Sequence, residues 1–308
     1  MPDPLRLVCL VSGGGTTLQN LLDRSADGMF PATVAGVVSS RADAFGVERA
    51  RRAGVPVLVE PRGPGFAERV WAAVRSFTPD LVCLAGWLHL LPIPADLRNR
   101  VLNIHPSLLP AFGGKGMYGR HVHEAVLAYG AKMTGCTVHF VTPGMDEGPT
   151  IAQASVAILA GDTPDILGAR VLVEEHKLYP RALAMVAASL AGTAPLIRRL
   201  GAADAAAYRA IRLEALQDAP TAFGSSYEAE CTRDLAEFES TVTRNYIAGA
   251  WLGGALVGTA GFHRLDATKV AHRGNIWGVY VRPEARGHGV ARALIADVLA
   301  FARTQVEQ

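Results

Sequence analysis

The chain has 308 residues, of which 50% are hydrophobic and 19% are charged, and its formal net charge is +2. This composition excludes a disordered chain, which needs low hydrophobicity and high net charge, and also a strongly basic nucleic-acid-binding surface. At roughly 100–200 residues per domain, the length predicts about two domains.

Apolar runs alternate with amphipathic segments through the first two-thirds of the chain, which predicts strands and helices in turn. The predicted strands are 5–11, 32–40, 55–60, 80–86, 100–105, 133–142 and 150–159. The predicted helices are 16–25, 42–53, 66–77 and 163–190. Strands that alternate with helices in this way indicate an α/β fold with a mostly parallel sheet flanked by helices.

The stretch 189–204 contains Gly and Pro and breaks the helical periodicity, so a domain boundary is predicted there. We place the two domains at 1–195 and 196–308. After the boundary the pattern predicts a helix, an irregular acidic stretch, three strands and a last helix. The predicted elements are 203–217, 245–254, 255–264, 274–283 and 290–304. The second domain is therefore expected to be smaller and of the α+β class.

A glycine-rich segment, Ser12-Gly13-Gly14-Gly15-Thr16, lies between the first predicted strand and the first helix. Glycines allow backbone N–H groups to approach an anion, and the helix N-terminus adds partial positive charge. Leu18 occupies the third glycine position of a dinucleotide-binding loop, which favours a simple phosphate instead. A tight turn without a ligand is the alternative.

Asn103 and His105 close a predicted strand, at the end where open α/β sheets bind their ligands. Being two residues apart on an extended segment, they share one face. Amide and imidazole N–H groups there can both stabilise a developing oxyanion. Asp146 lies in a turn, where an aspartate alone more often serves turn geometry. His139, in an alternating strand, is expected to be structural.

Together these segments resemble the glycinamide ribonucleotide formyltransferase family over about residues 5–190. The matching text is LVSGGGTTLQNLL, PDLVCLAGWLHLLP, VLNIHPSLLPAFGGKGMYGRHVHEAVL, TGCTVHFVTPGMDEGPTIAQASV and EEHKLYP. The resemblance implies a Rossmann-like fold and an enzyme of purine biosynthesis. It would transfer a formyl group from 10-formyltetrahydrofolate to the amine of glycinamide ribonucleotide. Asn103, His105 and Asp146 match the family's catalytic residues.

The resemblance also implies the binding residues. The substrate phosphate would be held by Ser12, Gly13, Gly14, Gly15 and Thr16, and Glu175 would lie near the ribose. The folate pocket would be formed by Arg62, Ala85, Gly86, Trp87, Leu88, Leu91, Thr142 and Met145. The segment 113–120 contains residues inserted relative to the family, which leaves the role of His121 open. This chemistry needs no metal.

Two alternatives stay open for the first domain. Formyltetrahydrofolate deformylases have a similar catalytic domain, but they usually carry an N-terminal regulatory domain, whereas here the first strand is predicted from residue 5. A non-catalytic folate- or nucleotide-binding protein is the other alternative. The intact set of Asn103, His105 and Asp146 argues against it, because binding alone would not need them.

The second domain carries a further glycine-containing loop between its last strand and last helix. This loop, Arg286-Gly287-His288-Gly289-Val290-Ala291, resembles the acetyl-CoA pyrophosphate loop of the GNAT acetyltransferases, within a resemblance over about 203–305. A plain glycine turn is the alternative. Members of that family continue beyond the helix that follows the loop, so we expect a truncated GNAT-like domain that is not a complete acetyltransferase. Its exposed sheet edge would be prone to self-association, which makes a homo-oligomer one expectation.

The four cysteines, Cys9, Cys83, Cys136 and Cys231, form no CxxC pair, so neither a zinc site nor a disulfide framework is predicted. No run of about 18 apolar residues predicts a membrane span, and the N-terminus lacks the pattern of a signal peptide. We therefore expect a cytoplasmic protein whose partners are small molecules, without nucleic acid, membrane or metal.

Overall fold

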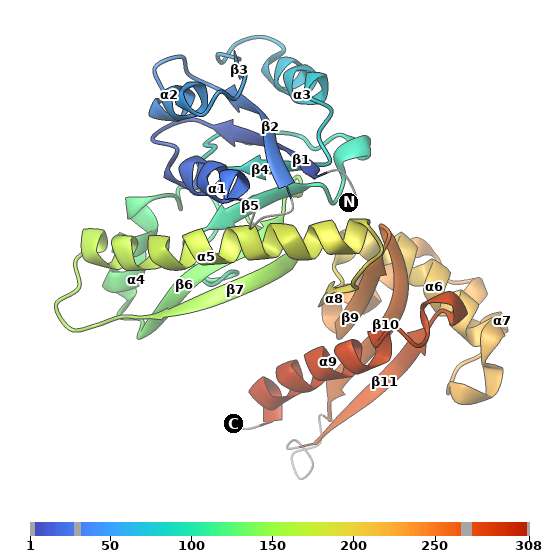
Figure 1. Ribbon diagram of the computed structural model, residues 1–308. Helices are drawn as coiled ribbons and strands as arrows, with labels where there is room; N and C mark the ends of the chain where they lie inside the picture. The colour runs from blue at the N-terminus through green and yellow to red at the C-terminus, as the bar shows by residue number, and fades with distance from the viewer. Residues whose placement is uncertain (1–3, 28–31, 266–272, 307–308) are drawn as a thin grey trace. The chain divides into compact units, whose positions relative to one another are not determined.

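The computed structural model describes residues 4–27, 32–265 and 273–306 (Figure 1). The chain divides into two compact units, Met1–Ala187 and Ala188–Gln308. The predicted domain boundary, between residues 195 and 196, falls inside the second unit. The division into domains at 1–195 and 196–308 stays a prediction.

A seven-stranded sheet forms the centre of the first unit, with the strand order β3-β2-β1-β4-β5-β6-β7. Its strands are β1 (Leu5–Val11), β2 (Ala32–Ser39), β3 (Val57–Val59), β4 (Leu81–Leu84), β5 (Val101–His105), β6 (Met133–Phe140) and β7 (Thr150–Ala157). The first five strands pair in parallel, and β6 and β7 are antiparallel. The predicted mostly parallel sheet is therefore confirmed.

Helices flank this sheet (Figure 1). They are α1 (Thr16–Ala26), α2 (Phe45–Arg52), α3 (Phe66–Ser76), the 3-10 turn η1 (Ala95–Leu97), α4 (Arg120–Tyr129) and α5 (Pro164–Leu190). The apolar stripes of the helices are buried, as shown by Leu18 and Leu21 of α1 and Val70 and Val74 of α3. Helix α4 was not predicted from the sequence.

The central strands have continuous apolar sequences because both of their faces are covered. In β1 and β4, Cys9 and Cys83 are register partners, and both are fully buried free thiols. From α5, the buried Tyr179 donates its hydroxyl hydrogen to the carbonyl oxygen of Leu102 in β5, at 2.9 Å. This bond ties α5 to the strand that carries Asn103 and His105.

The second unit contains a four-stranded antiparallel sheet with the order β11-β10-β9-β8. Its strands are β8 (Leu196–Arg199), β9 (Tyr246–Leu252), β10 (Ala255–Arg264) and β11 (Gly274–Val281). Its helices are α6 (Ala205–Asp218), α7 (Tyr227–Cys231), α8 (Leu235–Arg244) and α9 (Val290–Val306), with short 3-10 turns η2 (Ala202–Asp204), η3 (Pro220–Ala222) and η5 (Pro283–Ala285). The expected α+β class is confirmed.

Three elements of the second unit differ from the sequence analysis. Strand β8 lies in the stretch 189–204, where a domain boundary was predicted, and α7 and α8 lie in the acidic stretch expected to be irregular. Helix α8 begins at Asp234, whose side chain accepts a hydrogen bond from the N–H of Glu237, and it buries Phe238 and Val242. Its ten residues, LAEFESTVTR, include four apolar ones, of which only these two are buried, so the pattern is too weak to predict this helix.

In the part of the chain that the structure describes, no helix is both long and apolar enough to cross a membrane.

Candidate functional site

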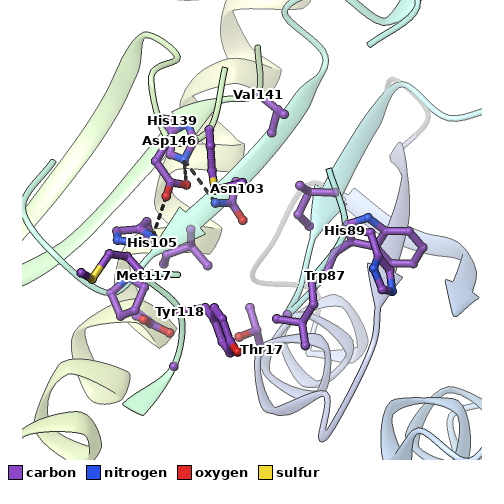
Figure 2. A pocket seen from close by; sticks show the side chains of 18 of the residues that line it. Thr17, Trp87, His89, Asn103, His105, Met117, Tyr118, His139, Val141 and Asp146 are labelled. Carbon is purple, nitrogen blue, oxygen red and sulfur yellow. Dashed lines mark hydrogen bonds and ion pairs between the residues drawn. The ribbon is translucent and has the colours of Figure 1, made fainter. Parts of the chain in front are cut away.

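A pocket of about 750 Å³ lies in the first unit, where several parallel strands end (Figure 2). Its wall includes Thr16 and Thr17 at the start of α1, the segment 86–91 after β4, and Asn103 and His105 of β5. The opposite wall includes residues of α4, α5 and the turn between β6 and β7. This is the place where an open α/β sheet binds its ligands.

His105 is buried at the end of β5 and uses both of its ring nitrogens. Its Nε2 lies 2.9 Å from the carbonyl oxygen of Phe112, and its Nδ1 lies 3.5 Å from Oδ2 of Asp146. A carbonyl oxygen and a carboxylate oxygen can only accept hydrogen bonds. Both ring nitrogens must therefore carry hydrogen for both contacts to be favourable, so this geometry suits a protonated imidazole.

Asp146 approaches His105 from the turn between β6 and β7. Its backbone φ is 59°, in the left-handed region, which Asp tolerates better than most residues. Its Oδ2 also accepts the N–H of Gly114 at 3.0 Å. The structure thus brings Asn103, His105 and Asp146 into one pocket, held by contacts with the segment that follows β5.

The glycine loop between β1 and α1 shows two kinds of glycine. Gly15 has φ 68°, and a Cβ on it would lie 2.7 Å from the Cα of Gly46, so a side chain does not fit there. At Gly13 and Gly14, a Cβ would have nothing within 4 Å. Open space therefore faces the backbone of the loop's middle, while the three glycines themselves do not line the pocket.

The two hydroxyl residues of the predicted phosphate loop differ in their surroundings. Thr16 lines the pocket, together with Thr17, which was not predicted. Ser12 is buried, and its Oγ accepts hydrogen bonds from the hydroxyl of Ser40 at 2.9 Å and from the N–H of Leu88 at 3.2 Å. The Ser12 side chain thus joins the loop to the segment after β4 rather than lining the pocket.

Glu175 projects from α5 into the pocket wall and is only 9% exposed. Burial raises the pKa of Glu175 to about 7, because a charged carboxylate loses its hydration there. Its carboxylate is consequently poised between two charge states near neutral pH.

Most of the predicted folate-pocket residues line the pocket: Gly86, Trp87, Leu88, Leu91 and Met145. The other three do not. Ala85 is buried, Thr142 is half-buried and Arg62 is exposed. Burial and the charge of Arg62 together lower the pKa of His89, a pocket residue that the sequence analysis did not include.

Aromatic rings form one wall of the pocket. Trp87 stacks on Phe66 with 5.9 Å between ring centroids, and His89 meets both rings edge-on. The indole N–H of Trp87 is buried and has no acceptor among the residues that the structure describes.

The structure also separates the two histidines of α4. His123 is buried and lines the pocket, whereas His121 is exposed and contacts Tyr118 and Glu124. Burial and the charge of His105 lower the pKa of His123. Residues two apart on a helix point in nearly opposite directions, so only one of the pair can face the site. Choosing between them requires the helix boundaries, and α4 was not predicted.

The predicted acetyl-CoA loop lies between β11 and α9 of the second unit. Arg286 donates to the carbonyl oxygen of Val281 at 2.9 Å and to Asp218 at 2.7 Å, so its guanidinium is already paired. Gly287 and Gly289 have φ of 81° and 74°, with no atom within 4 Å of an added Cβ. The loop therefore presents backbone rather than the Arg286 side chain to open space.

Over the described ranges, no three His, Cys, Asp or Glu side chains are grouped in a way that could hold a metal ion.

Comparison with known proteins yields matches to both units. Residues 5–183 match the family model described as formyl transferase, and residues 207–307 match that of the acetyltransferase (GNAT) family. Phosphoribosylglycinamide formyltransferase of Escherichia coli (strain K12) is 39% identical over 185 residues, which cover 57% of this chain and 84% of that protein. The chloroplastic phosphoribosylglycinamide formyltransferase of Arabidopsis thaliana is 44% identical over 187 residues, which cover 58% of this chain. The match spans 64% of that plant protein's length.

Solved structures give the same result. Glycinamide ribonucleotide transformylase 1 from Symbiobacterium toebii has 46% identity and a TM-score of 0.56, covering 61% of this chain and 89% of that one. Phosphoribosylglycinamide formyltransferase from Brucella melitensis has 42% identity and a TM-score of 0.56, covering 60% of this chain and 96% of that one. The chain therefore belongs to the formyl transferase family.

Proposed function

We propose that the chain is a phosphoribosylglycinamide formyltransferase, which transfers the formyl group of 10-formyltetrahydrofolate to the amine of glycinamide ribonucleotide. The observation that carries the proposal is the meeting of Asn103, His105 and Asp146 in one pocket of a formyl transferase fold. The names of the Escherichia coli and Arabidopsis thaliana relatives support it. No observation favours deformylation or a purely binding role.

The chemistry needs stabilisation of a negative charge that develops on the formyl oxygen. The neutral amine attacks the formyl carbon, a C–N bond forms and the carbonyl oxygen becomes an oxyanion. The amide N–H of Asn103 can donate a hydrogen bond to it, worth on the order of 3–4 kcal/mol. A protonated His105 ring stabilises it through its positive charge, since both ring nitrogens already face acceptors. Oδ2 of Asp146 lies 3.5 Å from Nδ1 of His105, so its negative charge faces this ring.

The second half of the reaction moves one proton. When the intermediate collapses, the bond between the formyl carbon and the folate nitrogen breaks, and a proton from the attacking amine ends on that leaving nitrogen. Asp146 can orient a water that carries this proton, because a carboxylate accepts hydrogen bonds at both oxygens. Every atom of the formyl group passes to the product, and no metal takes part in the proposal.

The pocket and the glycine loop that precedes Thr16 suit the two substrates. The aromatic and apolar wall around Trp87, Leu88 and Leu91 suits the flat rings of the folate. The open backbone at Gly13 and Gly14 suits the phosphate, and ionised Glu175 can accept hydrogen bonds from ribose hydroxyls. The predicted cytoplasmic location and homo-oligomer stay predictions.

For the second unit, we infer that the backbone of residues 286–291 binds the pyrophosphate of acetyl-CoA. The GNAT match over 207–307 and the open space beside Gly287 and Gly289 support this. Successive backbone N–H groups at the start of α9 can donate to the phosphate oxygens. Acetyl transfer is not part of the inference.

Replacing His105 by Ala or Asp146 by Asn should each lower kcat for formyl transfer by about 100-fold or more while the fold is kept. Purified variants are assayed with both substrates, and products are measured with and without glycinamide ribonucleotide. The control is His121→Ala, on the exposed side of α4, which should stay within about twofold of the unchanged protein. Near-normal turnover in either folded catalytic variant would contradict the mechanism, and formate released without the acceptor would indicate deformylation.

Gly14→Val should chiefly raise KM for glycinamide ribonucleotide, because the new side chain enters the open space that we assign to the phosphate. Gly15→Ala is the matched variant. It should instead lower the free energy of unfolding by about 1–3 kcal/mol, since φ 68° and the Gly46 backbone oppose a Cβ. Steady-state kinetics and urea unfolding on both variants separate the two effects. An unchanged KM in Gly14→Val would count against the phosphate assignment.

Substrate binding should weaken below the pKa of Glu175, which burial raises to about 7. Only the ionised carboxylate accepts with both oxygens, so kcat/KM for glycinamide ribonucleotide should fall by about tenfold per pH unit as the pH drops below 7. Glu175→Gln cannot titrate. Its kcat/KM should be lower at pH 8 and should lack the fall that protonation of Glu175 causes below pH 7. Parallel profiles for the two proteins would remove Glu175 from ribose binding.

Acetyl-CoA should raise the unfolding temperature of the full chain in a saturable way if residues 286–291 bind its pyrophosphate, because a ligand stabilises the state that it binds. A thermal-shift titration checks this, with acetate and pyrophosphate as separate controls. Absence of a shift up to millimolar acetyl-CoA would leave the loop a plain glycine turn.

A further inference from the structure

The side chain of Asn103, on β5, forms a hydrogen bond with a residue of the neighbouring strand β6. In the antiparallel pairing of β5 with β6, Asn103 lies opposite His139. Opposite residues on one sheet face have side chains within contact distance. The Nδ2 atom of Asn103 lies 3.2 Å from Nε2 of His139, and Figure 2 shows both side chains beside Asp146.

The backbone fixes which nitrogen of His139 carries hydrogen. Nδ1 of His139 lies 2.9 Å from the carbonyl oxygen of Phe140. A carbonyl oxygen only accepts, so Nδ1 must be the donor in this contact. In the neutral ring, Nε2 then carries a lone pair and no hydrogen. It can accept a hydrogen bond from the N–H of the Asn103 amide, but it cannot form one with the amide oxygen, which is also an acceptor.

Burial keeps His139 in this neutral form. The side chain is 2% exposed, and loss of hydration lowers the pKa of His139. Two titratable groups face the ring: Asp146, whose Oδ1 is 3.8 Å from Nε2, favours the charged form, and His105 opposes it. A charged ring would point an N–H of Nε2 at the N–H of Asn103, so the neutral ring fits the observed contact.

We propose that His139 is a positioning residue that fixes the rotation of the Asn103 amide. It holds the amide nitrogen, rather than the amide oxygen, on the side of His105 and Asp146. The second N–H of Asn103 has no acceptor among the described residues, so it remains as the oxyanion donor. A rotated amide would present its own oxygen to the developing negative charge. This inference rests on the proposed formyl transfer and revises the expectation that His139 is only structural.

Two substitutions of His139 separate its two contacts. In His139→Gln, the carboxamide reaches the place of Nε2 and can still accept from Asn103. In His139→Asn, the shorter carboxamide reaches only the place of Nδ1 and keeps the Phe140 contact. We expect His139→Gln to keep kcat within about tenfold and His139→Asn to lose about 100-fold. KM for both substrates should change little in either variant. If His139 were needed only for packing, His139→Gln would not keep a higher kcat than His139→Asn.

A double-mutant cycle with Asn103→Ala tests whether His139 acts through Asn103. Asn103→Ala alone should lower kcat by about 100- to 1,000-fold. Adding His139→Asn should cause no further loss, because the group that it positions is already absent. If His139→Asn does not fold, His139→Phe, which keeps a ring and lacks both nitrogens, takes its place with the same expected losses.

The outcomes are distinguishable from failure of the proposed function. If the protein without substitutions does not catalyse formyl transfer, the proposed function itself is wrong. An active unchanged protein in which the Gln and Asn variants have equal kcat would overturn the role of His139 alone. Losses that multiply in the double variant would also overturn it.

Discussion

The antiparallel pairing of β6 with β5 is the constraint on which the pocket depends. In its register Asn103 lies opposite His139, and His105 lies opposite Thr137. Because side chains alternate along a strand, Asn103, His105 and His139 face the same side of the sheet. Asp146 then lies within 3.8 Å of both histidines. The groups proposed to stabilise the oxyanion are therefore held by strand geometry, which is more precise than loop geometry.

The same arrangement gives the ring nitrogens of His105 and His139 different hydrogen-bonding partners. Both ring nitrogens of His105 face acceptors, the Phe112 carbonyl and the Asp146 carboxylate, and this suits a charged ring. His139 has one nitrogen at an acceptor and the other at an amide donor, which suits a neutral ring. Asp146 thus faces two imidazoles whose ring nitrogens have different partners. Different surroundings can in this way give two side chains of the same type different roles in one site at one pH.

Much of this site was predictable because it depends on local rules. The alternation of apolar strands with helices predicts the parallel sheet, and the spacing of Asn103 and His105 predicts a shared face at its edge. His139 was not recognised, because its role depends on the register between β5 and β6, and register is not encoded within one strand. His123 was not recognised for a similar reason: which side of α4 faces the pocket follows from packing.

The stretch 189–204 shows a different limit. Strand β8 was not predicted, because the Gly and Pro of 189–204 indicated a domain boundary. Its four residues also include Arg198, and a charged residue argues against a buried strand. Its guanidinium is nonetheless buried, paired with both oxygens of Asp204 at 2.7 and 2.8 Å and lying over the ring of Trp251. The partner that makes the burial tolerable lies outside the strand, so the pattern of β8 alone cannot predict it.

The segment 112–114, which follows β5, contacts both His105 and Asp146 and so belongs to the proposed catalytic geometry. The carbonyl oxygen of Phe112 accepts from His105, and the N–H of Gly114 donates to Asp146. Gly113, between them, has no room for a side chain, since a Cβ would lie 2.6 Å from a methyl group of Leu109 and 3.2 Å from the Cβ of Asp146. Three successive residues thus set the separation of the acid and the imidazole.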